Sequence, residues 1–259
     1  MLGRLSILLL LLPILGTPAF CGEYEKVHSI AVISALGNDF VMQNLGSTRL
    51  SSDEYTLHTD WNLDTQVKDV VAKALSSHFT VKDATGDTQI FLNLKNGLFS
   101  NFYHQMRDRI KTLPRNEEID AYVIVYPNLD DVPSIPGLSV IHEHSIFHSE
   151  VMTVYAYYKI GVFDATTGEM IDYGSAQYPA SGYLFGHQPP FEQCANDIWA
   201  DSEVQYTAEQ KNRLRQEMAS LITRSIAYTL ASAKLISKSE AASFTTQNAL
   251  PSEPSCHPA

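Results

Sequence analysis

Runs of apolar residues divide the first half of the chain into strands and amphipathic helices. Residues 27–35 (VHSIAVISA) are rich in β-branched side chains and predict a buried strand, with residues 40–45 as its hairpin partner. Apolar residues recur at helical spacing over residues 63–77 and 97–112, which predicts two helices packed on a core. Residues 121–126 (AYVIVY) are apolar on both faces and predict a central strand.

The second half of the chain carries the longest β pattern and the longest helical pattern. Residues 151–163 (VMTVYAYYKIGVF) predict one long strand, and a turn over residues 164–168 returns the chain into a partner strand over residues 170–178. A capping box begins at Thr207, and the apolar positions behind it predict a long helix to about residue 236. These elements predict an α+β (mixed α/β) fold: a single mixed sheet with a long β-hairpin and helices mainly on one face.

The pattern also sets the domain boundaries. Residues 1–21 are expected to be a signal peptide and residues 22–236 a single α/β domain, because no linker or repeat interrupts them. Residues 179–206 form a loop insert with many aromatic residues, and a connection of this length is usually functional or mobile. The polar, proline-containing residues 237–259 predict a disordered C-terminal tail.

The N-terminal segment has the three parts of an export signal. Arg4 supplies the positive charge, and residues 5–15 are an apolar run that is too short for a spanning helix of about 20 residues. Cleavage after Ala19 and cleavage after Cys21 both fit, and lipid attachment at Cys21 is a third option, although Phe20 is a poor neighbour for it. We therefore expect a periplasmic or secreted protein without a stable transmembrane span, and a lipid-anchored form is the less favoured alternative.

Composition and charge narrow the function classes. The 259 residues are 44% hydrophobic, which is typical of a globular protein, and the formal net charge of −11 argues against a nucleic-acid partner. Cys194 and Cys256 are the two cysteines beyond the signal, and an exported protein is expected to join such a pair as a disulfide. The alternatives are that both thiols are free or that Cys256 lies in a flexible tail. The chain has no C-x-x-C motif for a cysteine zinc site.

Three segments resemble a known group of envelope proteins. They are the opening strand IAVISALG, the strand AYVIVYP, and the hairpin YYKIGVFDATTGEMIDYGSA with its D-x-T-T-G-E turn. Together with the closing helix, they are similar to the periplasmic domain of the curli-secretion lipoprotein and of the penicillin-binding-protein activator lipoproteins. The N-terminal domain of the Tol-system propeller protein has a related shape. The resemblance covers about residues 27–178 and 207–236.

The resemblance implies an adaptor or assembly role in the cell envelope. That group is defined by its scaffold and not by catalytic residues, so it transfers no functional residue to this chain. The weak lipidation motif at Cys21 and the insert at residues 179–206 depart from the group.

Three histidines in the segment HEHSIFH are the candidate metal ligands. His142, His144 and His148 share parity, so a straight strand would point them to one face, and imidazole is a common ligand of zinc, copper and nickel. His142 and His144 have a spacing that suits one ion, whereas His148 needs a bend to join them, and Glu143 or Glu150 could also join from a bend. The alternative is a solvated strand end beside an acidic loop.

The aromatic insert is the candidate partner-binding surface. Its aromatic residues lie among glycines and prolines with few charges, as is common in protein interfaces; the candidates are Tyr183, Phe185, Phe191 and Trp199. The alternative is that they fold back and close the core.

The sequence favours a non-catalytic exported protein that binds an envelope protein partner. It has no P-loop, no dinucleotide-binding motif, no G-x-S-x-G and no H-E-x-x-H. No cofactor is expected apart from a transition metal. The alternative function is a metal-binding protein or a hydrolase-type enzyme that uses the histidine cluster.

Overall fold

The structure is a computed structural model that describes residues 24–46, 52–92, 94, 101–128, 137–144, 150–177, 189–250 and 256–258. Helices and strands are both present, so the predicted α+β class is confirmed. The described strands form two mixed sheets, however, and the prediction of a single sheet is wrong.

The two sheets differ in their strand order. The five-stranded sheet has the order β4 (Thr80–Lys82), β1 (Ser29–Ser34), β5 (Ala121–Pro127), β8 (Tyr158–Asp164), β9 (Met170–Ser175). The six-stranded sheet has the order β11 (Cys256–Pro258), β10 (Phe191–Cys194), β7 (Val151–Ala156), β6 (Leu138–Glu143), β2 (Asp39–Leu45), β3 (Ser52–His58). Each sheet contains both parallel and antiparallel neighbours.

The predicted strand over residues 151–163 passes from one sheet to the other. β7 pairs with β6 and β10 in the six-stranded sheet, while β8 pairs with β5 and β9 in the five-stranded sheet. The change occurs at Tyr157, whose backbone N–H donates to the Gly137 carbonyl and whose carbonyl accepts from Asn128 N–H. A continuous apolar pattern does not record this change of partner, because the side-chain alternation is the same in both sheets.

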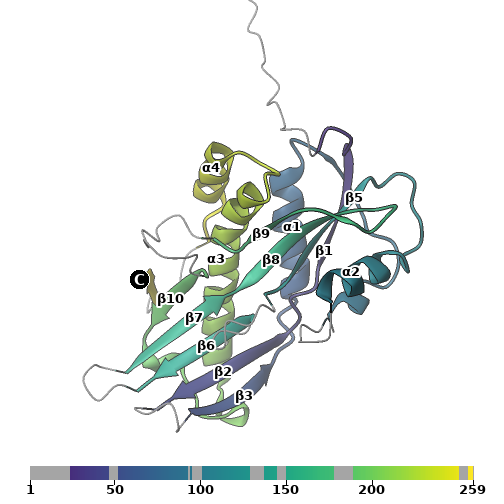
Figure 1. The fold of residues 1–259 in the computed structure, drawn as a ribbon. Coiled ribbons are helices and arrows are strands. Elements are labelled where there is room, and N and C mark those ends of the chain that lie inside the picture. The colour runs from purple at the N-terminus through teal and green to yellow at the C-terminus, as the bar shows by residue number, and fades with distance from the viewer. Residues whose placement is uncertain are drawn as a thin grey trace, which may run out of the picture.

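Helices cover both faces of the five-stranded sheet. On one face, α1 (Leu63–Leu75) and α3 (Ala208–Ser232) pack on the larger apolar cluster, and α3 runs behind both sheets (Figure 1). On the other face, α2 (Phe102–Ile110) and the short helix η1 (Thr88–Phe91) pack on a second cluster built around Ile33, Tyr122 and Ile124. The strand β5 is therefore buried on both sides, as predicted, but the helices do not lie mainly on one face.

The predicted disordered tail contains a helix and a strand. α4 (Lys238–Asn248) begins with a capping box of Ser237 and Glu240 and lies beside α3 (Figure 1). Beyond it, β11 adds an edge strand to β10, where Cys256 faces Cys194. The polar composition of residues 237–259 predicted disorder, but the capping box of α4 and the disulfide at Cys256 order the described part of this segment. The prediction is therefore wrong for α4 and β11.

The described part of the aromatic insert joins the fold. It contains β10 and the short helices η2 (Asn196–Ile198) and η3 (Glu203–Gln205), and it leads directly into α3. The capping box at Thr207 and Gln210, which starts α3, is confirmed. Within the described ranges, no helix is both long and apolar enough to cross a bilayer.

Candidate metal site

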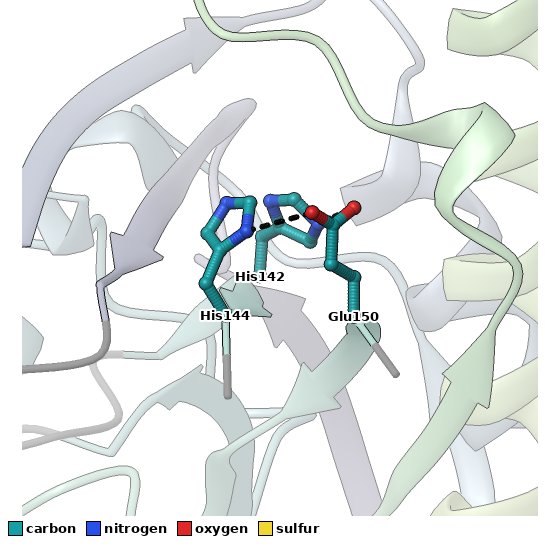
Figure 2. Close-up of side chains that lie close together, drawn as sticks. All are labelled: His142, His144 and Glu150. Carbon is teal, nitrogen blue, oxygen red and sulfur yellow. Dashed lines mark hydrogen bonds and ion pairs between the residues drawn. The ribbon is translucent and has the colours of Figure 1, made fainter. Parts of the chain in front are cut away.

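Two histidines and one glutamate converge where β6 ends and β7 begins (Figure 2). His142 lies in β6 on the same face as the core residue Val140, and His144 follows one step beyond the strand. Glu150 directly precedes β7, which is antiparallel to β6. The hairpin register thus brings two residues near the end of one strand to face one residue at the start of the next.

The atoms that could bind a metal are close together. His144 Nδ1 lies 3.0 Å from Glu150 Oε1, and His142 Nε2 lies 3.9 Å from Glu150 Oε2. The two imidazole rings meet edge to face with 4.3 Å between their centroids. One ligand atom from each of the three residues can be chosen so that all lie within 4.8 Å of one another.

Burial separates the two histidines. The His142 side chain is only 5% exposed, whereas His144 and Glu150 are 37% and 54% exposed. Neither ring nitrogen of His142 has a hydrogen-bond partner among the described residues. Burial, and then the neighbouring His144, lowers the pKa of His142, so its imidazole is held in the neutral form that a metal ion requires.

The segment after β10 supports the cluster from the other side. The Trp199 ring stacks on His142 with centroids 4.8 Å apart, and its indole N–H donates to Asp201. Asn196 Nδ2 donates to both the backbone oxygen and the Oε2 atom of Glu150, at 3.0 and 3.3 Å. These contacts fix the His142 ring plane and the direction of the Glu150 carboxylate.

The three donors fit a first-row transition metal. Two imidazole nitrogens and a carboxylate are common ligands of zinc, copper, nickel and iron(II). Metal–ligand bonds of about 2.1 Å place tetrahedral ligand atoms about 3.4 Å apart, so only small side-chain shifts are needed. An ion bound by His144 Nδ1 and the Glu150 carboxylate would take the place of the hydrogen bond between them.

The structure describes some of the candidate residues named from the sequence, and the others lie outside its described ranges. His142 and His144 come together as predicted, while His148, Tyr183 and Phe185 lie outside the described residues. Phe191 is part of β10 and stacks on Tyr155, with centroids 5.6 Å apart. Trp199 is buried against the core, so it follows the core-closing alternative. Phe191 is half-buried on the face of β10 that points away from the buried side chains of Glu192 and Cys194, so it does not close the core.

Two of the supporting residues were not predicted to lie at this site. Asn196 and Trp199 reach it from a segment some fifty residues further along the chain, and no local pattern links that segment to the histidines. Glu150 had a weak signal in the sequence. It was named only as a residue that could join from a bend, because its place depends on the register of the β6–β7 pair.

The predicted disulfide is present. Cys194 and Cys256 are bonded across β10 and β11, at positions that pair in the antiparallel ladder. The bond closes a loop with a sequence separation of 62 and anchors the strand that precedes Asn196 and Trp199.

The fold and this site define an α+β protein of two mixed sheets with a two-histidine, one-carboxylate cluster. No protein-family model matches the chain, and no curated protein matches its sequence. A solved structure with some likeness is that of the hypothetical protein CT253 from Chlamydia trachomatis. It is 10% identical, the match covers 80% of this chain and 96% of that one, and the TM-score is 0.34. A likeness of that size carries no argument about function.

Proposed function

We propose that this is an exported metal-binding protein that holds one transition-metal ion at His142, His144 and Glu150. The observation that carries the proposal is the buried His142 imidazole, whose two nitrogens have no hydrogen-bond partner among the described residues and which faces a histidine and a carboxylate. A buried polar group without a partner is costly, and a metal ion at this position would satisfy one of its nitrogens. Export is supported by the disulfide, a bond typical of oxidising compartments.

The adaptor function remains a second prediction, and the described contacts give it less support. Of its four candidate residues, Trp199 is buried in the core, whereas Phe191 is half-buried and stacks on Tyr155. The resemblance to the envelope lipoproteins likewise stays a prediction, since none of the comparisons bears on it.

Metal binding is tested on the chain from residue 22 onward, with the disulfide intact. We expect the purified, chelator-treated protein to take up about one equivalent of Zn²⁺ or Cu²⁺ by titration calorimetry. Loss of a ligand in His144→Ala or Glu150→Gln is expected to lower the affinity at least about tenfold. Both side chains are partly exposed, so neither variant should disturb the core.

The matched control is His58→Ala. His58 Nδ1 lies 2.9 Å from Asp39 Oδ1, so this pair copies the contact between His144 and Glu150 without a second imidazole. The affinity of His58→Ala should equal that of the unchanged protein. Absence of binding, or equal binding by all three variants, would overturn the proposed function.

Trp199 supplies an independent readout. Its ring stacks on His142, so binding of paramagnetic Cu²⁺ is expected to quench its fluorescence. The chain has two tryptophans, and Trp61→Phe removes the other signal. Quenching that persists in Glu150→Gln at low Cu²⁺ concentration would place the ion elsewhere.

A further inference from the structure

The cross-strand pairs of the β6–β7 hairpin place a fourth side chain at the site. The register sets His142 opposite Met152 and Glu143 opposite Val151. The next pair outward on the face of His142 is then His144 and Glu150, as their 3.0 Å contact shows. Two adjacent cross-strand pairs therefore form a square with His142, His144, Glu150 and Met152 at its corners.

Met152 and His142 form the buried pair of this square. Met152 is fully buried, and its side chain lies on the face shared with Val154 and the other core residues of the sheet. Directly opposed residues in an antiparallel pair have Cβ atoms about 4.5–5.5 Å apart. A methionine side chain has three rotatable bonds and a polarizable sulfur, so its thioether can reach an ion bound by the residue opposite.

We propose that the Met152 thioether is the fourth ligand and that the site is selective for copper, above all copper(I). This inference rests on the proposed function and specifies its metal. Soft thioether sulfur favours copper(I), whereas a site of imidazoles and carboxylate alone is equally suited to zinc. The thioether also needs no hydrogen bond, so a buried methionine at this corner carries no unsatisfied group when the ion is absent.

The position of the ligand atoms favours Met152 over the other neighbour of His142. Asn44 pairs with His142 on the opposite flank, in β2, and its Oδ1 is buried without a hydrogen-bond partner in the described structure. The Glu150 carboxylate belongs to the β7 side, however, and it lies near both imidazoles. An ion held by all three residues is therefore centred over the β6–β7 pair, which contains Met152 and excludes Asn44.

The test compares two metals in matched methionine variants. Affinity for Cu(I), kept reduced with ascorbate under anaerobic conditions, is measured against a chromophoric copper(I) chelator, and affinity for Zn²⁺ against a zinc indicator. Met152→Leu is expected to lower the Cu(I) affinity at least about tenfold and to leave the Zn²⁺ affinity unchanged. Leucine conserves most of the volume, and thermal unfolding of the apo-protein verifies that the variant is folded.

Met42→Leu is the control variant. Met42 is also fully buried on the core face of the six-stranded sheet, but it pairs with Val140 and Tyr55 and not with a histidine. It should leave both affinities unchanged. The same measurements on Asn44→Ala ask whether the amide oxygen is the fourth ligand instead.

The outcomes separate the two proposals. If Met152→Leu binds Cu(I) as tightly as the unchanged protein, or if Asn44→Ala shows the larger loss, the copper inference is overturned, while metal binding lost in Glu150→Gln still supports the proposed function. If the unchanged protein binds neither Cu(I) nor Zn²⁺, the proposed function itself fails. A loss of Cu(I) affinity in Met152→Leu alone supports both.

Discussion

The Arg224 cluster and His142 both place polar groups in the interior on the α3 side of the six-stranded sheet, but their hydrogen-bonding differs. Arg224 of α3 pairs with the fully buried carboxylates of Glu192 in β10 and Glu217 in α3, the latter at 3.3 Å, and its Nε donates to the Ser220 carbonyl. His142 is almost as deeply buried, yet both of its nitrogens lack a hydrogen-bond partner within the described chain.

Under the proposed function, the difference is that between a structural group and a ligand-binding one. A charge that is paired inside the protein stabilises the fold as long as all of its partners remain. An unpaired imidazole raises the free energy of the empty protein, and it is retained where a ligand will occupy it. We therefore expect the two groups to respond to substitution with opposite signs.

The largest expected effect is at the arginine. Arg224→Leu leaves two carboxylates buried without their cation, so we expect the free energy of unfolding to fall by about 3–5 kcal/mol. Urea denaturation followed by circular dichroism measures it. The control is Arg213→Leu, on the same helix, whose partner Asp197 is 61% exposed and whose loss should cost about 1 kcal/mol or less. Equal losses in the two variants would contradict the structural role of the buried pairs.

A smaller effect of opposite sign is expected at the histidine. His142→Phe replaces a buried ring, whose nitrogens have no hydrogen-bond partner among the described residues, with an apolar one, so the apo-protein should unfold at the same free energy or gain up to about 1 kcal/mol. The variant should also lose the stabilisation that added Zn²⁺ gives the unchanged protein. Both are read from denaturation curves with chelator and with metal. A loss above about 2 kcal/mol in chelator would show that the imidazole is structural.

The smallest expected effect is the pH dependence of the apo-protein. Burial and then His144 lower the pKa of His142 in the folded state, so the unfolded chain binds the proton more tightly. Stability is therefore complete above the ordinary histidine pKa of about 6.5 and decreases as the pH falls through it. Unfolding curves between about pH 7.5 and pH 5 should show a steeper loss for the unchanged protein than for His142→Phe. Parallel curves would mean that His142 does not titrate differently on folding.

Local sequence patterns predicted the positions of helices and strands better than they predicted which strands pair with one another. The helix over residues 63–77 is observed as α1, and the capping box at Thr207 starts α3, because both depend on side chains a few residues apart. The exchange of sheets at Tyr157 depends on backbone bonds to Asn128 and Gly137, which no periodicity encodes. The order of the tail depends in part on a covalent bond to a distant strand.

The same distinction between local pattern and tertiary pairing applies to the residues of the candidate site. His142 and His144 were predicted because two residues of like parity share a face of a strand. Glu150 could be named only as an option, because its place depends on the hairpin register, and Trp199 was assigned to a partner surface. Residues that arrive from a separate segment require the tertiary fold, which sequence spacing alone does not supply.

The disulfide makes the maturation of this protein depend on the interval between the appearance of its two cysteines. If the chain is exported as it is synthesised, Cys194 reaches the oxidising compartment before Cys256, because a sequence separation of 62 lies between them. At about 5–20 residues per second, Cys194 waits roughly 3–12 s for its partner. During that interval β10 lacks its outer neighbour β11, and its thiol is open to a wrong bond, including one with a second nascent chain. If β10 docks onto β7 within that interval, the Cys194 thiol is shielded from a wrong bond until Cys256 arrives.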